Sequence, residues 1–118
     1  MGLGMPDYVD DEYEWDIDKS EATYALRGFD FAFASQLFDQ DQRLERLDLR
    51  REYGEERNIT WGIVEGVQIT VVWTPRSHRK RIIAAFLSDD EDLREYEQAY
   101  GWSWTWPHRP VEDSSKDP

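Results

Sequence analysis

Four cationic side chains gather in the six-residue run RSHRKR at positions 76–81, where a predicted turn leads into a predicted strand. Because side chains alternate along a strand, we expect Arg79 and Arg81 on one face and Lys80 on the other. The planar guanidinium group matches two phosphate oxygens, so paired arginines suit a phosphodiester. The same charges could instead guard an edge strand against aggregation, and this alternative stays open.

A second candidate is the run Glu55-Glu56-Arg57, just before another predicted strand. If the strands that follow are neighbours, Arg57 lies near Arg81 with a carboxylate beside it. Such a set is sufficient for RNA cleavage without a metal, because the 2′-hydroxyl attacks the adjacent phosphorus while arginines stabilise the added charge. The alternative is a surface ion pair that contributes little to stability.

Two further sets of residues have simpler explanations. Glu14, Asp16 and Asp18 alternate as metal-binding carboxylates can, but the glycine and the final glutamate of a calcium-binding loop are missing, so helix capping accounts for them better. No metal and no other cofactor is expected. Three indoles, Trp102, Trp104 and Trp106, share one face of an extended segment, which predicts either docking on the chain's own core or a partner interface.

The composition bounds the classes of protein that need to be considered. The 118 residues predict one domain, and 26 acidic against 14 basic residues give a net charge of −12. This charge favours either simple solubility, a basic partner, or a surface that imitates nucleic acid. The absence of cysteine excludes disulfides and a thiol nucleophile, and no apolar run is long enough to span a membrane, so a cytoplasmic protein is expected.

The periodicity predicts an α+β fold with two N-terminal helices, a four-stranded antiparallel meander and one C-terminal helix. A helix should run from Asp16 or Asp18 to Arg27, with Ala22, Ala25 and Leu26 on its buried face. A second helix is expected over 31–38, strands over 43–49, 59–63, 67–74 and 79–86, and a last helix from a capping box at 88–91 to about 100. The expected organisation is a flexible acidic leader over 1–12, a folded domain over 13–100, and a Trp-containing, largely flexible tail over 101–118.

Several short strings follow one another in an order typical of one family. They are YEWD at 13–16, then Lys19, Gly28 and Phe31, LFD at 37–39, REYGEER at 51–57, VVWT at 71–74 and RKRIIAA at 79–85, before a helix that carries Tyr96. Over about residues 13–100 the sequence therefore resembles the BrnT-type toxins of bacterial toxin–antitoxin pairs, which are small ribonucleases with a RelE-like fold.

The resemblance implies a metal-independent endoribonuclease that inhibits translation, together with a cognate antitoxin. It implies that Arg57 and Arg81 stabilise the transition state and that Tyr96, together with Glu55 or Glu56, supports them. Arg76, Arg79 and Lys80 would then contact the RNA backbone, and Arg27 would stand in for a missing family cation.

The chain also departs from the family pattern. It has Leu26-Arg27-Gly28 where the family usually has Lys-His-Gly, and Ala84-Ala85-Phe86 where it usually has Ser-Ala-Arg. The alternative function is therefore a catalytically inactive toxin-fold protein that binds another protein as an acidic inhibitor, of a nucleic-acid-mimicking or phage counter-defence type. Either function allows homo- or hetero-oligomers.

Overall fold

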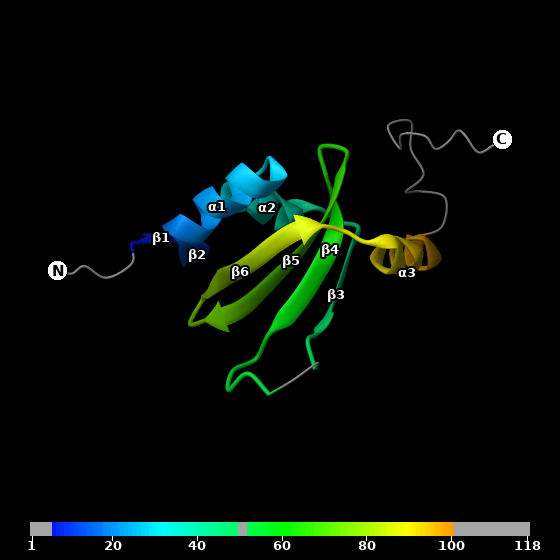
Figure 1. Ribbon diagram of the computed structural model, residues 1–118. Helices are drawn as coiled ribbons and strands as arrows, with labels where there is room; N and C mark the ends of the chain where they lie inside the picture. The colour runs from blue at the N-terminus through cyan, green and yellow to red at the C-terminus, as the bar shows by residue number, and fades with distance from the viewer. Residues whose placement is uncertain (1–5, 50–51, 101–118) are drawn as a thin grey trace.

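The computed structural model describes residues 6–49 and 52–100, which form a six-stranded sheet with helices beside it (Figure 1). The strands lie in the order β1-β2-β6-β5-β4-β3. Their bounds are β1 Asp7–Val9, β2 Tyr13–Asp16, β3 Arg43–Leu47, β4 Asn58–Val64, β5 Val67–Arg76 and β6 Arg79–Leu87. Strands β3 to β6 are antiparallel neighbours, whereas β2 pairs with β6 in parallel.

The predicted fold class is wrong, because the sheet is mixed and has six strands rather than four. Strands β1 and β2, which form an antiparallel hairpin before the first helix, were not predicted. These strands span three and four residues, too few to show a clear alternation. The parallel pairing of β2 with β6 joins segments that are far apart in the chain, and local periodicity carries no information about such a partner.

The helices are α1 Ile17–Arg27, α2 Phe31–Ser35, the 3₁₀ turn η1 Gln36–Asp39, and α3 Asp90–Tyr100. As predicted, Asp16 caps α1, accepting a hydrogen bond from the Lys19 backbone N–H at 3.1 Å. Gly28 ends the helix in the left-handed conformation, with φ of 87°. The cap of α3 lies one residue later than predicted, since Asp89 and Asp92 each accept a hydrogen bond from the other's backbone N–H.

The predicted buried face of α1 is wrong. Its buried residues are Ser20 and Thr23, whereas the side chain of Leu26 is 75% exposed. The Ser20 hydroxyl accepts a hydrogen bond from the Phe31 N–H at 3.0 Å, so a short polar side chain joins α1 to the start of α2. This contact satisfies a buried backbone donor, which an alanine at that position could not do.

The main core lies between one face of the sheet and the helices α1, α2 and η1, which cover that face. Its largest fully buried side chains include Phe31, Leu37, Ile69 and Ile82. Helix α3 lies beyond the β3 edge of the sheet (Figure 1). It packs against β3 and β4, and its Tyr96 packs with Trp61 and Ile63 on the face opposite α1 and α2. We call this second side, on which α1 and α2 do not pack, the open face.

The domain boundaries stay a prediction, although the structure describes part of each region. Residues 7–9 of the expected leader form strand β1, with Tyr8 stacked on Trp15 at 4.4 Å between ring centroids. The expected tail over 101–118, including Trp102, Trp104 and Trp106, lies outside the described residues. No helix in the described part of the chain is long and apolar enough to cross a membrane.

Candidate functional site

Three of the predicted arginines lie together at one end of the open face. Arg81 belongs to β6, Arg76 ends β5, and Arg57 comes one residue before β4. Thr74 of β5 lies opposite Arg81, and the pairing of Asn58 with Trp73 extends to place Arg57 next to the same threonine. Arg57 and Arg81 are therefore two strand spacings apart, about 10 Å between backbones, a gap that two arginine side chains can close around one phosphate.

Acidic side chains connect these arginines into a continuous row. Arg57 Nε contacts Glu55 Oε2 at 3.4 Å, and Glu55 Oε1 accepts from Arg76 Nη2 at 3.3 Å. Glu14 of β2 lies 3.9 Å from Arg76 Nη1 and accepts from Arg81 Nη1 at 2.9 Å. Alternating charges in a row attract their neighbours, and the carboxylates also compete with any phosphate that approaches.

Arg81 is the most fully paired of the three arginines. Besides Glu14, it faces Asp7 of β1, whose two carboxylate oxygens accept from Nη1 and Nη2 at 3.2 Å each. This two-pronged contact has the geometry with which a guanidinium group grips a phosphate. The hydrogen bond with Asp7 raises the pKa of Arg81, outweighing burial, which acts to lower it.

Arg57 is held differently. Its Cζ lies 4.2 Å from the centroid of the Tyr53 ring, and its Nε faces Glu55. Among the described residues, its terminal nitrogens Nη1 and Nη2 have no hydrogen-bond partner. Arg57 therefore presents an open guanidinium edge, whereas Asp7 already occupies that of Arg81.

Arg79 and Lys80 show the alternation expected of a strand. Arg79 donates from Nε to the Asp10 carbonyl at 2.6 Å, next to the row. Lys80 lies on the opposite face, where its Nζ is 5.2 Å from the ring centroids of both Phe38 and Trp73. The structure thus places Arg79 beside the candidate site and Lys80 away from it.

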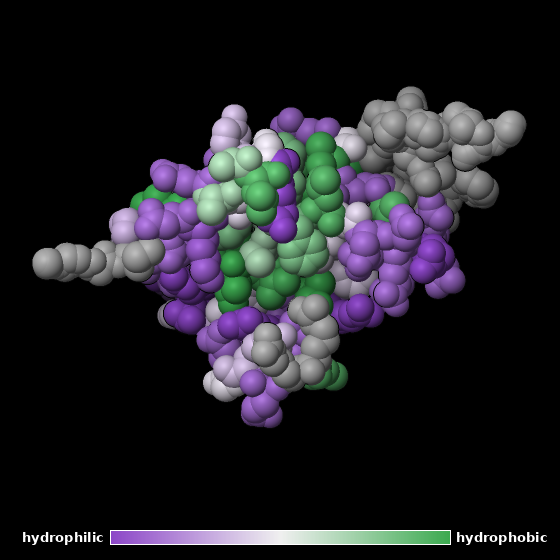
Figure 2. Space-filling view, viewed as in Figure 1, coloured by the Kyte–Doolittle hydropathy of each residue, from purple (hydrophilic) through white to green (hydrophobic). Residues whose placement is uncertain are grey.

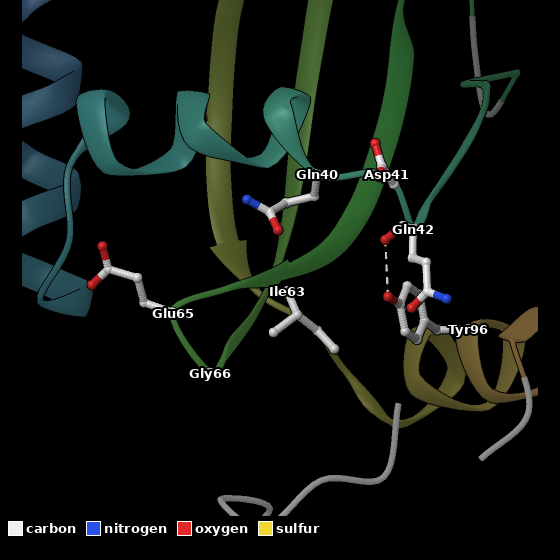
Figure 3. A pocket seen from close by; sticks show the side chains of 7 residues that line it. All are labelled: Gln40, Asp41, Gln42, Ile63, Glu65, Gly66 and Tyr96. Atoms are coloured by element: carbon white, nitrogen blue, oxygen red, sulfur yellow. Dashed lines mark hydrogen bonds between the residues drawn. The ribbon is translucent and has the colours of Figure 1, made fainter. Parts of the chain in front are cut away.

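Arg27 and Tyr96 lie far from the row. Arg27 is exposed in the last turn of α1 and lines a shallow hollow with Phe86, five residues along β6 from Arg81 and so about 17 Å away. Tyr96 is buried and donates to the Gln42 carbonyl at 2.9 Å, beside Ile63 in an open groove (Figure 3). Because Ile63 is six residues along β4 from Arg57, that groove lies about 20 Å from the arginines.

The two carboxylates that bind Arg81 and the aromatic ring next to Arg57 were not predicted as parts of the site. Glu14 was weighed only as a metal ligand or helix-capping residue, and Asp7 was placed in a flexible leader. Alternation along Tyr13–Asp16 could have put Glu14 and Asp16 on one face, but nothing local links that face to β6. Tyr53 was named only as part of the family string at 51–57, although its spacing from Arg57 allows the ring and the cation to meet.

Beyond the charged row, the centre of the open face is apolar. Figure 2 shows hydrophobic side chains gathered over the centre of the sheet, with hydrophilic residues around them. Strand pairing places Ile59, Val72 and Ala84 on this face, and Ile59 and Ala84 are only half-buried. The open face thus combines a charged row at one end with an apolar centre in which Val72 is buried and Ile59 and Ala84 are half-buried.

Fold and site together define a small α+β protein with arginines from separate strands on the open face of a mixed sheet. A family described as "Ribonuclease toxin, BrnT, of type II toxin-antitoxin system" matches residues 15–91 of the chain. The chain belongs to this family of ribonuclease toxins, as the resemblance predicted. No curated protein matches the chain closely enough to add a relative.

Proposed function

We propose that this protein cleaves single-stranded RNA without a metal ion, using Arg57 and Arg81 to hold the scissile phosphate on the open face. The observation that carries the proposal is the single row in which Glu55, Arg76 and Glu14 join these two arginines. Membership of a ribonuclease toxin family supports the same reaction.

The chemistry is an in-line transfer within the RNA. The 2′-hydroxyl oxygen attacks the adjacent phosphorus, its proton passes to Glu55, and the bond from phosphorus to the 5′-oxygen breaks. The products are a 2′,3′-cyclic phosphate and a free 5′-hydroxyl, which takes its proton from solvent. Arg57 and Arg81 stabilise the extra negative charge of the transition state, and Arg76 and Arg79 contact the flanking backbone.

The test is to incubate the purified protein with RNA in the presence of EDTA and to identify the product ends. We expect 2′,3′-cyclic phosphates, and Arg57→Gln and Arg81→Gln should each lower kcat by roughly 100-fold. Arg94→Gln, which removes one exposed charge from α3, is the matched control and should cleave at the wild-type rate. Equal activity in all four preparations would point to a contaminating nuclease and refute the assignment.

A second function is favoured by the pairing of the arginines with Asp7, Glu14 and Glu55. If these carboxylates exclude phosphate, the protein acts as a catalytically inactive binder of another protein, as its charge of −12 also allows. Intact RNA at high concentrations of a folded sample, with no affinity for RNA, would favour this alternative.

Membership of the family implies a protein antitoxin as partner. We propose that the cognate antitoxin covers the apolar centre of the open face, because half-buried Ile59 and Ala84 would otherwise remain in contact with water. Co-purification with the product of a neighbouring small gene tests this, and Ile59→Asp should weaken the complex. An unchanged complex would place the antitoxin elsewhere.

A further inference from the structure

The Arg57 guanidinium group lies over the aromatic ring of Tyr53. The Arg57 Cζ atom sits over the Tyr53 ring at 4.2 Å from the centroid, well within the range of a cation–π contact. The only ion pair of Arg57 among the described residues, with Glu55, is long at 3.4 Å. The guanidinium group therefore has the Tyr53 ring against its central carbon as well as the Glu55 carboxylate beside Nε.

The ring itself is anchored in the protein. The Tyr53 hydroxyl donates to Asp48 Oδ2 at 2.9 Å, and Asp48 is only 5% exposed. The Asp48 backbone N–H in turn donates to the Arg57 carbonyl at 2.8 Å. Asp48, Tyr53 and Arg57 thus form a closed circuit of contacts between the end of β3 and the start of β4.

This circuit leaves the working edge of Arg57 available. The Tyr53 ring contacts the guanidinium group at Cζ and Glu55 contacts Nε, whereas Nη1 and Nη2 have no hydrogen-bond partner among the described residues. A planar fork that is already oriented loses less freedom when it grips a phosphate. Free rotation of the same side chain would lower the share of molecules in a productive geometry.

We propose that Tyr53, held by Asp48, is a positioning residue that presents Arg57 to the scissile phosphate. The inference rests on the proposed function, because Arg57 is placed there as a phosphate ligand. Tyr53 itself does not touch the substrate. Its ring sets the plane of the guanidinium group, and its hydroxyl sets the plane of the ring.

The proposal is tested with Tyr53→Phe, which keeps the ring, and Tyr53→Leu, which removes it. We expect Tyr53→Leu to lower kcat by about 10- to 100-fold, with a smaller change in KM, and Tyr53→Phe to lose only a few-fold. In ¹H–¹⁵N spectra, the ring-current shift of the Arg57 Nε–Hε signal should persist in Tyr53→Phe and vanish in Tyr53→Leu. Tyr53→Met serves as a second ringless variant if Tyr53→Leu does not fold.

A double-mutant cycle separates positioning from a general loss of structure. In an Arg57→Gln background, Tyr53→Leu should cause no further loss of affinity for an uncleavable, fully 2′-O-methylated RNA, because the group it positions is gone. The proposal would be overturned if the two substitutions lowered RNA affinity additively, or if the Arg57 Nε–Hε signal of Tyr53→Leu stayed at its wild-type position.

The affinity and spectral measurements do not require turnover. An inactive wild-type protein would therefore defeat the proposed ribonuclease function while these two measurements still decide the role of Tyr53. Normal cleavage by both Tyr53 variants would leave the ribonuclease function standing and refute the positioning role.

Discussion

Replacing Asp7 by asparagine should increase the affinity of this protein for RNA. Asp7 belongs to β1, which precedes the residues matched by the family, and it occupies both terminal nitrogens of Arg81. A phosphate that binds Arg81 must displace this carboxylate. Asparagine keeps the size of the side chain and removes its charge, so the competitor is weakened while β1 is retained.

The size of the gain follows from the exposure of the pair. The side chain of Asp7 is 41% exposed and that of Arg81 is 20% exposed, so the contact lies at the surface. Surface pairs contribute about 0.2–1 kcal/mol, which is about 1.4- to fivefold in affinity. Repulsion between the displaced carboxylate and the phosphate acts in the same direction, so we expect roughly two- to tenfold tighter binding.

The assay is fluorescence anisotropy with a labelled, fully 2′-O-methylated RNA of mixed sequence, which binds without being cleaved. Asp11→Asn is the matched control, because it removes the same charge from the β1–β2 turn and Asp11 contacts neither Arg81 nor another arginine of the row. The difference between the two variants should shrink at high salt. Equal affinities for Asp7→Asn and Asp11→Asn at low salt would show that the contact with Arg81 does not restrain RNA binding.

Two further predictions concern stability. Gly62→Ala should destabilise the fold by about 1–3 kcal/mol in denaturant titrations, because the new Cβ would lie 2.8 Å from Leu37 Cδ1 and 3.2 Å from the Gln42 carbonyl oxygen. Adding Leu37→Val to Gly62→Ala should recover part of this loss of stability. If the two substitutions instead destabilise the fold additively, the clash is not the cause. Burial raises the pKa of Tyr13 to about 12 from 10.0, so the folded state favours the protonated phenol. The contribution of the raised Tyr13 pKa to stability is complete below pH 10 and is lost as the pH rises towards 12. The free energy of unfolding of Tyr13→Phe should therefore fall less than that of the wild type over this range. Parallel curves of unfolding free energy against pH for the two proteins would refute the assignment.

Local features of the sequence were sufficient to predict much of the antiparallel part of the sheet. The expected strands over 59–63 and 67–74 leave room for a short turn, and Glu65 and Gly66 have the positive φ, 49° and 82°, that a tight hairpin turn requires. The opposite orientations of Arg79 and Lys80 followed from the period of two. The buried face of α1 could not be predicted in this way, because its contacts are the hydrogen bond of Ser20 with Phe31 rather than an apolar stripe.

The candidate site shows where this kind of prediction fails. Tyr96 was grouped with Arg57 because both belong to the family pattern, yet they lie at opposite ends of β4. Conversely, Asp7 and Glu14 reach Arg81 only because β2 pairs in parallel with β6. Neither relation is visible in the spacing of residues along the chain.

The sequence by itself limited the N-cap of α1 to Asp16 or Asp18 and determined the strands on both sides of the turn before β5 and the alternation along β6, because each depends on residues within a few positions of one another. Only the tertiary structure decided which strands became neighbours, and therefore which carboxylates face Arg57, Arg76 and Arg81. Strand partners are chosen by burial and by backbone hydrogen bonds summed over the whole sheet, and no short window of sequence contains that sum.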